Sequence, residues 1–196
     1  MTQSIVAIGA SGSQGLKDLR ELLLAFPKTI DAVVLAVLHR SPDSKSQLLR
    51  VLSEESPIPV VIAEQGERVR TGVCYIGEPA EHLSLLSAKF TGLTGHVDHL
   101  HRNRTIDFLL ASVAEHVGKD AIGVILSGTS HDGSRGLAAI HHAGGTTMVF
   151  ATDDDDSATD DMPENAAKYD GLVDVRGTIG QIAEAIGKQL KGAGAT

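Results

Sequence analysis

Three side chains in this sequence, Ser11, His39 and Asp132, have the types needed for hydrolytic catalysis, and each comes after a run of apolar residues. A serine hydroxyl is a weak nucleophile at neutral pH and needs an imidazole to take its proton. The imidazole in turn needs a carboxylate to fix its tautomer and stabilise its charged form. Each residue alone has a plainer explanation as a turn or strand-end residue. Their joint placement predicts a Ser-His-Asp site.

The segment around Ser11 has a second feature, a glycine-rich turn that leads from an apolar run into a helical pattern. Such a turn exposes backbone N–H groups, and the start of a helix adds a partial positive charge. It can present a nucleophile beside an oxyanion pocket or cradle a phosphate. Gly9, Gly12 and Gly15 form a G-x-x-G-x-x-G pattern, and Arg40 could face a 2′-phosphate. A dinucleotide-binding, reductase-like protein is therefore the alternative.

The elements that must position these residues follow from the apolar pattern. Short apolar runs alternate with segments of helical spacing, which predicts an α/β fold: a doubly wound, mainly parallel sheet flanked by helices. A small antiparallel hairpin is expected near residues 73–86, and a polar loop over 89–104. Strands are expected at 5–8, 32–38, 60–63, 121–126, 146–150 and 172–175, and helices at 16–24, 46–52, 106–117, 136–143, from 166, and at 179–190. In such sheets, ligands bind beyond the carboxyl ends of the strands, where Ser11, His39 and Asp132 are expected.

Length and composition bound the class of protein. The chain has 196 residues, 42% of them hydrophobic, which favours one catalytic domain over residues 1–190 and a disordered tail over 191–196. The net charge of −8 argues against nucleic acid or an anionic membrane as the main partner. The one cysteine, Cys74, excludes a disulfide framework and fits a cytoplasmic setting. We find no signal peptide and no apolar run long enough to embed the chain in a membrane.

Two polar segments could in principle bind metal. His96, Asp98, His99 and His101 lie close together, and residues 153–156 are all aspartate, with Asp160 and Asp161 following. No second ligand cluster at matched spacing supports either site. We interpret the first segment as a polar loop on the substrate side and the second as a solvated loop, and we expect neither a metal nor another cofactor.

The motifs around the three catalytic candidates resemble a known family. The segments 8–11 (I-G-A-S) and 126–136 (L-S-G-T-S-H-D-G-S-R-G), with the strand that ends in His39, look like the catalytic domain of the chemotaxis receptor protein-glutamate methylesterase, CheB. Similar segments at 75–79, 105–107 and 161–163 follow in the right order, and the resemblance extends over about residues 4–188.

The resemblance implies hydrolysis of glutamate methyl esters on chemoreceptors or receptor-like signalling proteins, and in some members deamidation of glutamine. Ser11 would be the nucleophile, His39 the general base and acid, and Asp132 the residue that orients His39. The backbone at Gly12 and Ser13 would supply oxyanion donors, with Thr129 and Met162 on the substrate side. The family usually carries an N-terminal receiver domain, whereas this chain begins at the first strand. A receiver domain was therefore removed or never present, and it or another regulator could act in trans.

The chain also departs from the family pattern near the nucleophile. Gly12, Ser13 and Gln14 stand where the family has a small residue and two glycines, and Thr129 replaces a methionine. These changes leave open a further alternative, a catalytically impaired regulatory member of the family.

Overall fold

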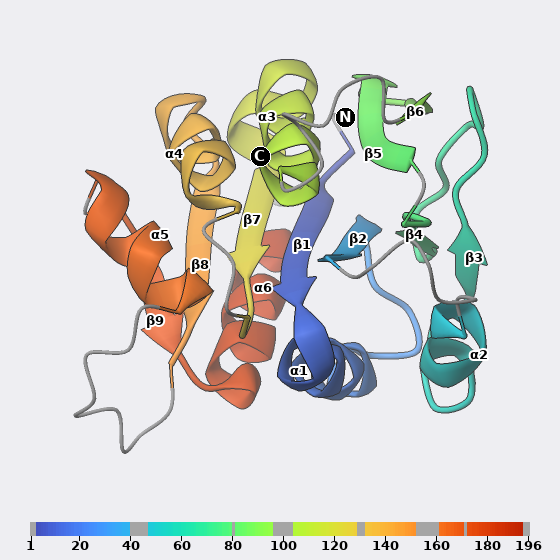
Figure 1. The fold of residues 1–196 in the computed structure, drawn as a ribbon, viewed down its shortest axis with the longest axis horizontal. Coiled ribbons are helices and arrows are strands. Elements are labelled where there is room, and N and C mark those ends of the chain that lie inside the picture. The colour runs from blue at the N-terminus through green and yellow to red at the C-terminus, as the bar shows by residue number, and fades with distance from the viewer. Residues whose placement is uncertain are drawn as a thin grey trace.

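The computed structural model describes residues 3–39, 47–79, 81–95, 104–128, 132–151, 161–170 and 172–193. Its main feature is a seven-stranded sheet in which every paired strand runs parallel, in the order β3-β4-β2-β1-β7-β8-β9 (Figure 1). The strands are β1 (Ile5–Ser11), β2 (Val33–His39), β3 (Val60–Ile62), β4 (Cys74–Ile76), β7 (Ala121–Ile125), β8 (Thr146–Phe150) and β9 (Val175–Gly177). The helices are α1 (Gly12–Leu24), α2 (Leu48–Ser53), α3 (Thr105–Val117), α4 (Ser134–His142), α5 (Met162–Asp170) and α6 (Ile179–Ala193), with a short 3₁₀ helix at Gly118–Asp120. The predicted α/β class is confirmed.

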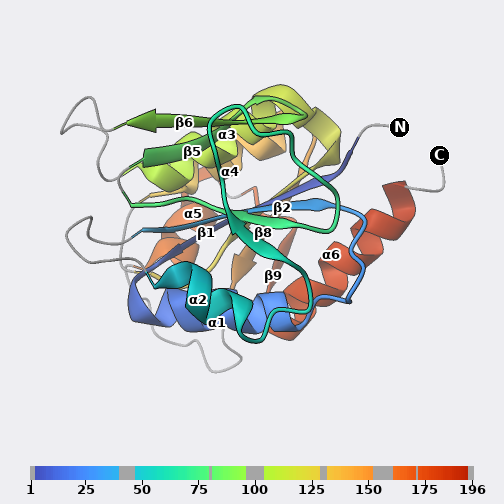
Figure 2. The same cartoon turned by 90° about the vertical axis from the view of Figure 1, so that its right-hand side faces the viewer.

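The central strands are apolar along their length because both of their faces are covered. All seven residues of β1 are buried, as are the first six of β2. Side chains alternate between the faces, so neighbouring residues of β1 belong to separate apolar clusters. Val6, Ile8 and Ala10 pack with α1, α2 and α6, whereas Ile5 and Ala7 pack with α3, α4 and α5. Figure 2 shows these two helical layers on opposite sides of the sheet.

The expected antiparallel hairpin is present, but it lies later in the chain than predicted. It consists of β5 (Glu81–Ser87) and β6 (Phe90–Gly95), which lie in front of α3 in Figure 2. Cys74–Ile76 instead pairs in parallel with β2 and β3 inside the main sheet. The expectation of a polar loop was therefore wrong for residues 90–95. The strand there is rich in threonine and glycine, and it is fixed by its pairing with β5 and by the buried Thr91 hydroxyl, which donates to the Glu64 carbonyl.

The helix boundaries also differ from the expected ones in two places that matter here. Helix α1 begins at Gly12, directly after β1, with no intervening loop. Helix α6 continues to Ala193, beyond the expected end at residue 190, and residues 194–196 lie outside the described part of the chain. Within the described part, no helix combines the length and apolar character needed to cross a membrane.

Candidate functional site

Ser11 lies at the junction between β1 and α1. It is the last residue of the strand and the N-cap of the helix, with an extended backbone (φ −143°, ψ 142°). Its N–H donates to the Ser127 carbonyl at 3.0 Å, which ties it to the end of β7. N-cap serines commonly accept a hydrogen bond from the helix backbone, but the Ser11 hydroxyl makes no such bond. The hydroxyl is therefore not committed to capping.

The first turn of α1, which directly follows Ser11, is exposed to solvent. Gly12 has φ +70°, a left-handed conformation that lets the strand turn directly into the helix. Gly12 and Ser13 are both exposed, and a Cβ added at Gly12 would meet no atom within 4 Å. The first N–H groups of a helix have no partner inside it, and they carry its partial positive charge. This turn can therefore bind an oxyanion.

His39 lies beside Ser11 because their strands are neighbours in register. Ser11 and His39 are Cα partners at the carboxyl ends of β1 and β2. The imidazole is half-buried, and burial lowers its pKa below the usual 6.5. At neutral pH it is therefore in the neutral form, which can accept a proton. Within the described residues, no hydrogen bond joins the His39 side chain to Ser11 or Asp132.

Asp132 follows β7 on the other side of β1, and its carboxylate lies against the start of α3. One oxygen, Oδ2, accepts from the Ile106 N–H, and Oδ1 accepts from the Asp107 N–H, both at 2.8 Å. Only 2% of Asp132 is exposed. Burial raises its pKa to about 7, and the hydrogen bonds from the backbone of Asp107 and Ile106 oppose part of this shift.

Asp107 forms the reciprocal contact. Its Oδ1 accepts from the Gly133 N–H at 3.1 Å and from the Gly136 N–H at 2.8 Å. Asp132 thus caps the first turn of α3, and Asp107 caps the first turn of α4. The two carboxylates lock the starts of the two helices together, which fixes the turn that carries Asp132.

Met162, predicted on the substrate side, is fully buried next to the nucleophile. Its N–H donates to the Gly128 carbonyl at 2.9 Å. A Cβ on Gly128 would lie 2.5 Å from the Ser11 Cβ and 2.7 Å from the Met162 sulfur. Gly128 is therefore the point at which Met162 and Ser11 approach each other. Thr129, the other predicted substrate-side residue, lies outside the described residues.

The sequence analysis missed Asp18, a charged residue on the buried face of α1. Only 3% of it is exposed. Its Oδ1 accepts from the Gln14 side-chain amide at 2.8 Å, and its Oδ2 accepts from the Ser127 N–H at 3.2 Å. Ser127 in turn holds the Ser11 N–H, so Asp18 links the first turn of α1 to the backbone of the nucleophile. Its place among the buried Leu19 and Leu22 of one helical stripe is the sequence signal that could have revealed it.

Most residues of the two segments considered for metal binding lie outside the described part of the chain. His96, Asp98, His99 and His101, and residues 152–160, lie outside the described residues. Asp161 is described, and its Oδ1 accepts from the Glu164 N–H at 3.0 Å at the start of α5. Among the residues that the structure describes, no group of three or more His, Cys, Asp or Glu side chains could hold a metal ion.

Comparison with known proteins assigns the chain. Residues 6–186 match CheB methylesterase. The chain belongs to the CheB methylesterase family. The crystal structure of the CheB methylesterase catalytic domain of Thermotoga maritima matches with a TM-score of 0.83 and 29% identity, over 97% of this chain and 99% of that chain.

Curated members of the CheB family agree with this assignment. The protein-glutamate methylesterase/protein-glutamine glutaminase 1 of Burkholderia pseudomallei (strain 1710b) is 35% identical over 178 residues, 89% of this chain and 48% of that protein. The Pectobacterium atrosepticum protein-glutamate methylesterase/protein-glutamine glutaminase is 32% identical over 177 residues, 89% of this chain and 49% of that protein. The chain thus spans about half the length of these relatives. Membership of the family favours the interpretation that the turn at Ser11 presents a nucleophile over the interpretation that it binds the phosphate of a dinucleotide.

Proposed function

We propose that this chain is a serine hydrolase of the protein-glutamate methylesterase type, which converts a glutamate methyl ester into glutamate and methanol. The observation that carries the proposal is the position of Ser11. Its hydroxyl is uncommitted at the open N-terminus of α1, and its register partner on the next strand is His39. This placement at the neighbouring ends of β1 and β2 supports a nucleophile at Ser11, a base at His39 and N–H donors in the first turn of α1.

The proposed reaction has two steps. In the first, His39 takes the Ser11 proton as Oγ attacks the ester carbonyl, and the first-turn N–H groups at Gly12 and Ser13 stabilise the oxyanion. His39 then gives its proton to the departing methoxide, which leaves as methanol. In the second step, His39 takes a proton from water as the water attacks the acyl-enzyme, and it returns that proton to Ser11 Oγ as the acyl–Oγ bond breaks. The glutamate is released as a carboxylate, and its proton passes to solvent. Asp132 orients His39 and stabilises its charged form.

The proposal extends to substrate and setting. The substrate is a methylated chemoreceptor or receptor-like signalling protein in the cytoplasm, and a receiver domain or other regulator acts in trans. The names of the relatives include glutaminase activity, so glutamine deamidation at the same serine is part of the proposal. An amide and an ester carbonyl pass through the same kind of tetrahedral intermediate.

Labelling with a fluorophosphonate, followed by mass spectrometry of the adduct, tests the assignment. We expect one adduct on Ser11, with labelling lost in Ser11→Ala and strongly slowed in His39→Ala. The exposed Ser53 on α2 offers a matched control, and Ser53→Ala should label like the parent. Absence of an adduct together with stabilisation by NADPH would indicate the dinucleotide-binding alternative. Absence of both would indicate an impaired regulatory member.

A further inference from the structure

A groove of about 500 Å³ runs along the outer face of α3, between β5 and the first turn of α4. We call it the α3 groove. Its floor is apolar, made by Leu85, Phe108 and Ala111. Its lining on α3 extends from Arg104 to Glu115, which corresponds to roughly 16 Å at 1.5 Å per residue. A span of this length accommodates about five residues of an extended polypeptide at about 3.3 Å per residue.

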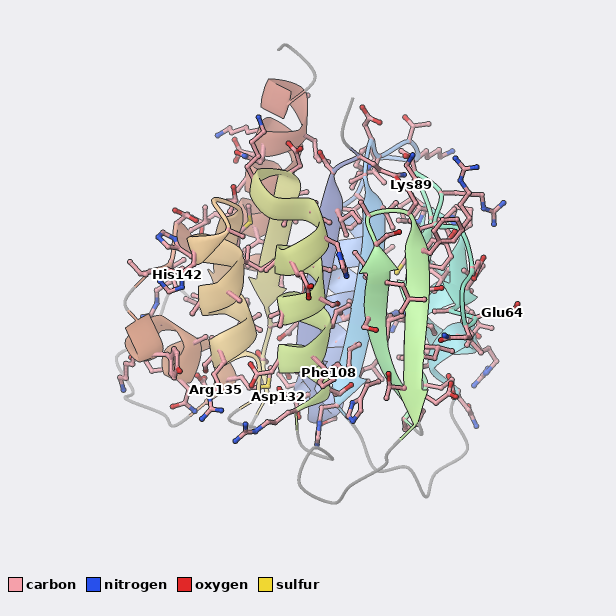
Figure 3. All side chains as sticks on the ribbon, turned by 90° about the horizontal axis from the view of Figure 1, so that it is seen from above. Glu64, Lys89, Phe108, Asp132, Arg135 and His142 are labelled. Atoms are coloured by element: carbon pink, nitrogen blue, oxygen red, sulfur yellow. The ribbon has the colours of Figure 1, made fainter. Side chains whose placement is uncertain are left out.

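One end of the α3 groove adjoins the proposed site. Asp107 lines the groove, and its N–H holds the Asp132 carboxylate at 2.8 Å. Figure 3 shows Phe108, Asp132 and Arg135 along one edge of the molecule. The groove therefore begins next to Asp132, one of the three proposed catalytic residues.

Two arginines line this end of the groove. Arg104 is the N-cap of α3, and Arg135 is the second residue of α4; both are exposed. Within the described part of the chain, neither guanidinium forms an ion pair or a side-chain hydrogen bond. The nearby Asp107 carboxylate is used by the backbone of α4.

Helix stability does not explain these two arginines. The N-terminus of a helix carries a partial positive charge, so a cation there is disfavoured, and an acidic residue would be the stabilising choice. Here two helix starts converge, and both carry an arginine on the groove side. The two arginines nevertheless lie together at one end of the groove. A ligand that brings carboxylates to this end accounts for their placement.

Phe108 adds a fixed apolar surface between the charged ends. It is 41% exposed, and its ring stacks on the buried His82 with a centroid distance of 5.5 Å. An aromatic ring held in this way loses little conformational freedom when a ligand packs on it. The opposite end of the groove carries the exposed Glu115, so the charge along the groove is asymmetric.

We propose that the α3 groove is the substrate-recognition surface of this hydrolase. Arg104 and Arg135 bind carboxylates that flank the esterified glutamate in an acidic polypeptide, and Phe108 packs against its apolar side chains. This proposal rests on the proposed function, because it takes the ester at Ser11 as the anchor of the bound segment. The low number of cations and the negative net charge disfavour a nucleic acid as the occupant.

The test uses two synthetic peptides that differ only beside one glutamate γ-methyl ester, which is flanked by glutamates in one and by glutamines in the other. We expect the parent to have the higher kcat/KM for the acidic peptide, and this preference should shrink as salt is added. Arg104→Gln combined with Arg135→Gln should lower kcat/KM for the acidic peptide by about three- to thirtyfold, mainly through KM. Arg50→Gln on α2 is the matched control and should keep the parental ratio between the peptides.

Equal rates for the two peptides with the parent, or a double variant that lowers both rates alike, would overturn the proposal. Thermal unfolding of the double variant checks that the fold is intact. If the parent hydrolyses neither ester, the proposed function fails. Fluorescence anisotropy then tests separately whether the α3 groove binds an acidic peptide. In that case labelled acidic peptide should bind Ser11→Ala more tightly than labelled neutral peptide, and the double arginine substitution should remove the difference. Equal binding would reject the groove independently.

Discussion

Gly128 shows how closely the surroundings of Ser11 are fitted at the level of single residues. The glycine lies between the Ser11 backbone and the Met162 sulfur, and there is no room for a methyl group on it. Its carbonyl also accepts the Met162 N–H. A side chain at this position has to displace the nucleophile, the methionine or both.

Gly128→Ala is therefore expected to lower kcat by about 10²-fold or more, since a displacement of about 1 Å in a catalytic group has an effect of this size. The measurement is ester hydrolysis by a variant whose folding is checked by circular dichroism. Gly187→Ala on α6 is the matched control, because a Cβ there meets no atom within 4 Å. This control should keep full activity, and Ala should favour the helix by about 0.5–1 kcal/mol. Parental activity in Gly128→Ala would show that Ser11 is not held at this point.

Sequence reasoning placed Ser11 and His39 at neighbouring strand ends because each ends an apolar run, and strand ends in a parallel sheet meet at one edge. It could not show how Asp132, Asp107 and Asp18 are used. Their hydrogen bonds join residues far apart in the chain, such as Asp18 and Ser127, and spacing along the sequence carries no information on such contacts. The sequence nevertheless contains a sign of this role for Asp18. A charged residue on the apolar stripe of a helix needs hydrogen-bond partners when it is buried.

At the level of elements, the site depends on the joint start of α3 and α4. Neither helix carries a side-chain cap of its own, and each takes an aspartate from the other helix or its preceding turn. The close approach of Gly136 to the Asp107 backbone lets the two helix starts meet. Movement of either helix would therefore move Asp132.

Two substitutions at Asp107 separate its hydrogen bonds from its charge. Asp107→Ala removes both bonds to α4 and should lower the free energy of unfolding by about 0.5–2 kcal/mol, with a fall in kcat because the Asp132 turn is released. Asp107→Asn keeps an acceptor oxygen and should retain most of the stability and kcat. Urea unfolding and steady-state kinetics measure these effects. Glu115→Ala, on an exposed position of the same helix, is the stability control. Equal loss of kcat in the Ala and Asn variants would mean that charge, not geometry, is what Asp107 supplies.

Among the elements, the covered strands were the easiest to predict because a strand buried on both faces is apolar throughout. The short strands β4 and β6 were misassigned. Cys74–Ile76 carries no mark that distinguishes a strand of the main sheet from one of a hairpin. In β6 the buried positions include a threonine and a glycine. Their strand conformation comes from pairing partners elsewhere in the chain, which outweigh local preference.

For the whole molecule, we expect Asp132 to change stability and activity in opposite directions as pH rises. Its pKa is raised from an ordinary value of 3.8 to about 7 by burial, so the unfolded chain ionises this group first. The stabilisation is complete below about pH 3.8 and is lost as pH rises through about 7. The proposed mechanism needs the opposite state, with Asp132 ionised and His39 neutral.

We therefore expect the free energy of unfolding to fall by on the order of 2–3 kcal/mol between about pH 5 and pH 8 through this group, while kcat/KM rises with a midpoint near pH 7. Urea titrations and ester hydrolysis across this range measure the two quantities. In Asp132→Asn this part of the stability change should disappear, and turnover should fall by orders of magnitude. A variant with the parental pH dependence of stability would show that Asp132 does not titrate in this range.

The strand order has a consequence for the chain as it is being made. Strands β1 to β4 form one half of the main sheet, and strands β7 to β9 form the other half. The two halves meet where β1 pairs with β7. Ser11 and His39 leave the ribosome early and share one pair of strands, whereas Asp132 and the helices that hold it come from the later half. A nascent chain thus contains the proposed nucleophile and base well before the proposed orienting acid, and neither half of the sheet carries all three proposed catalytic residues.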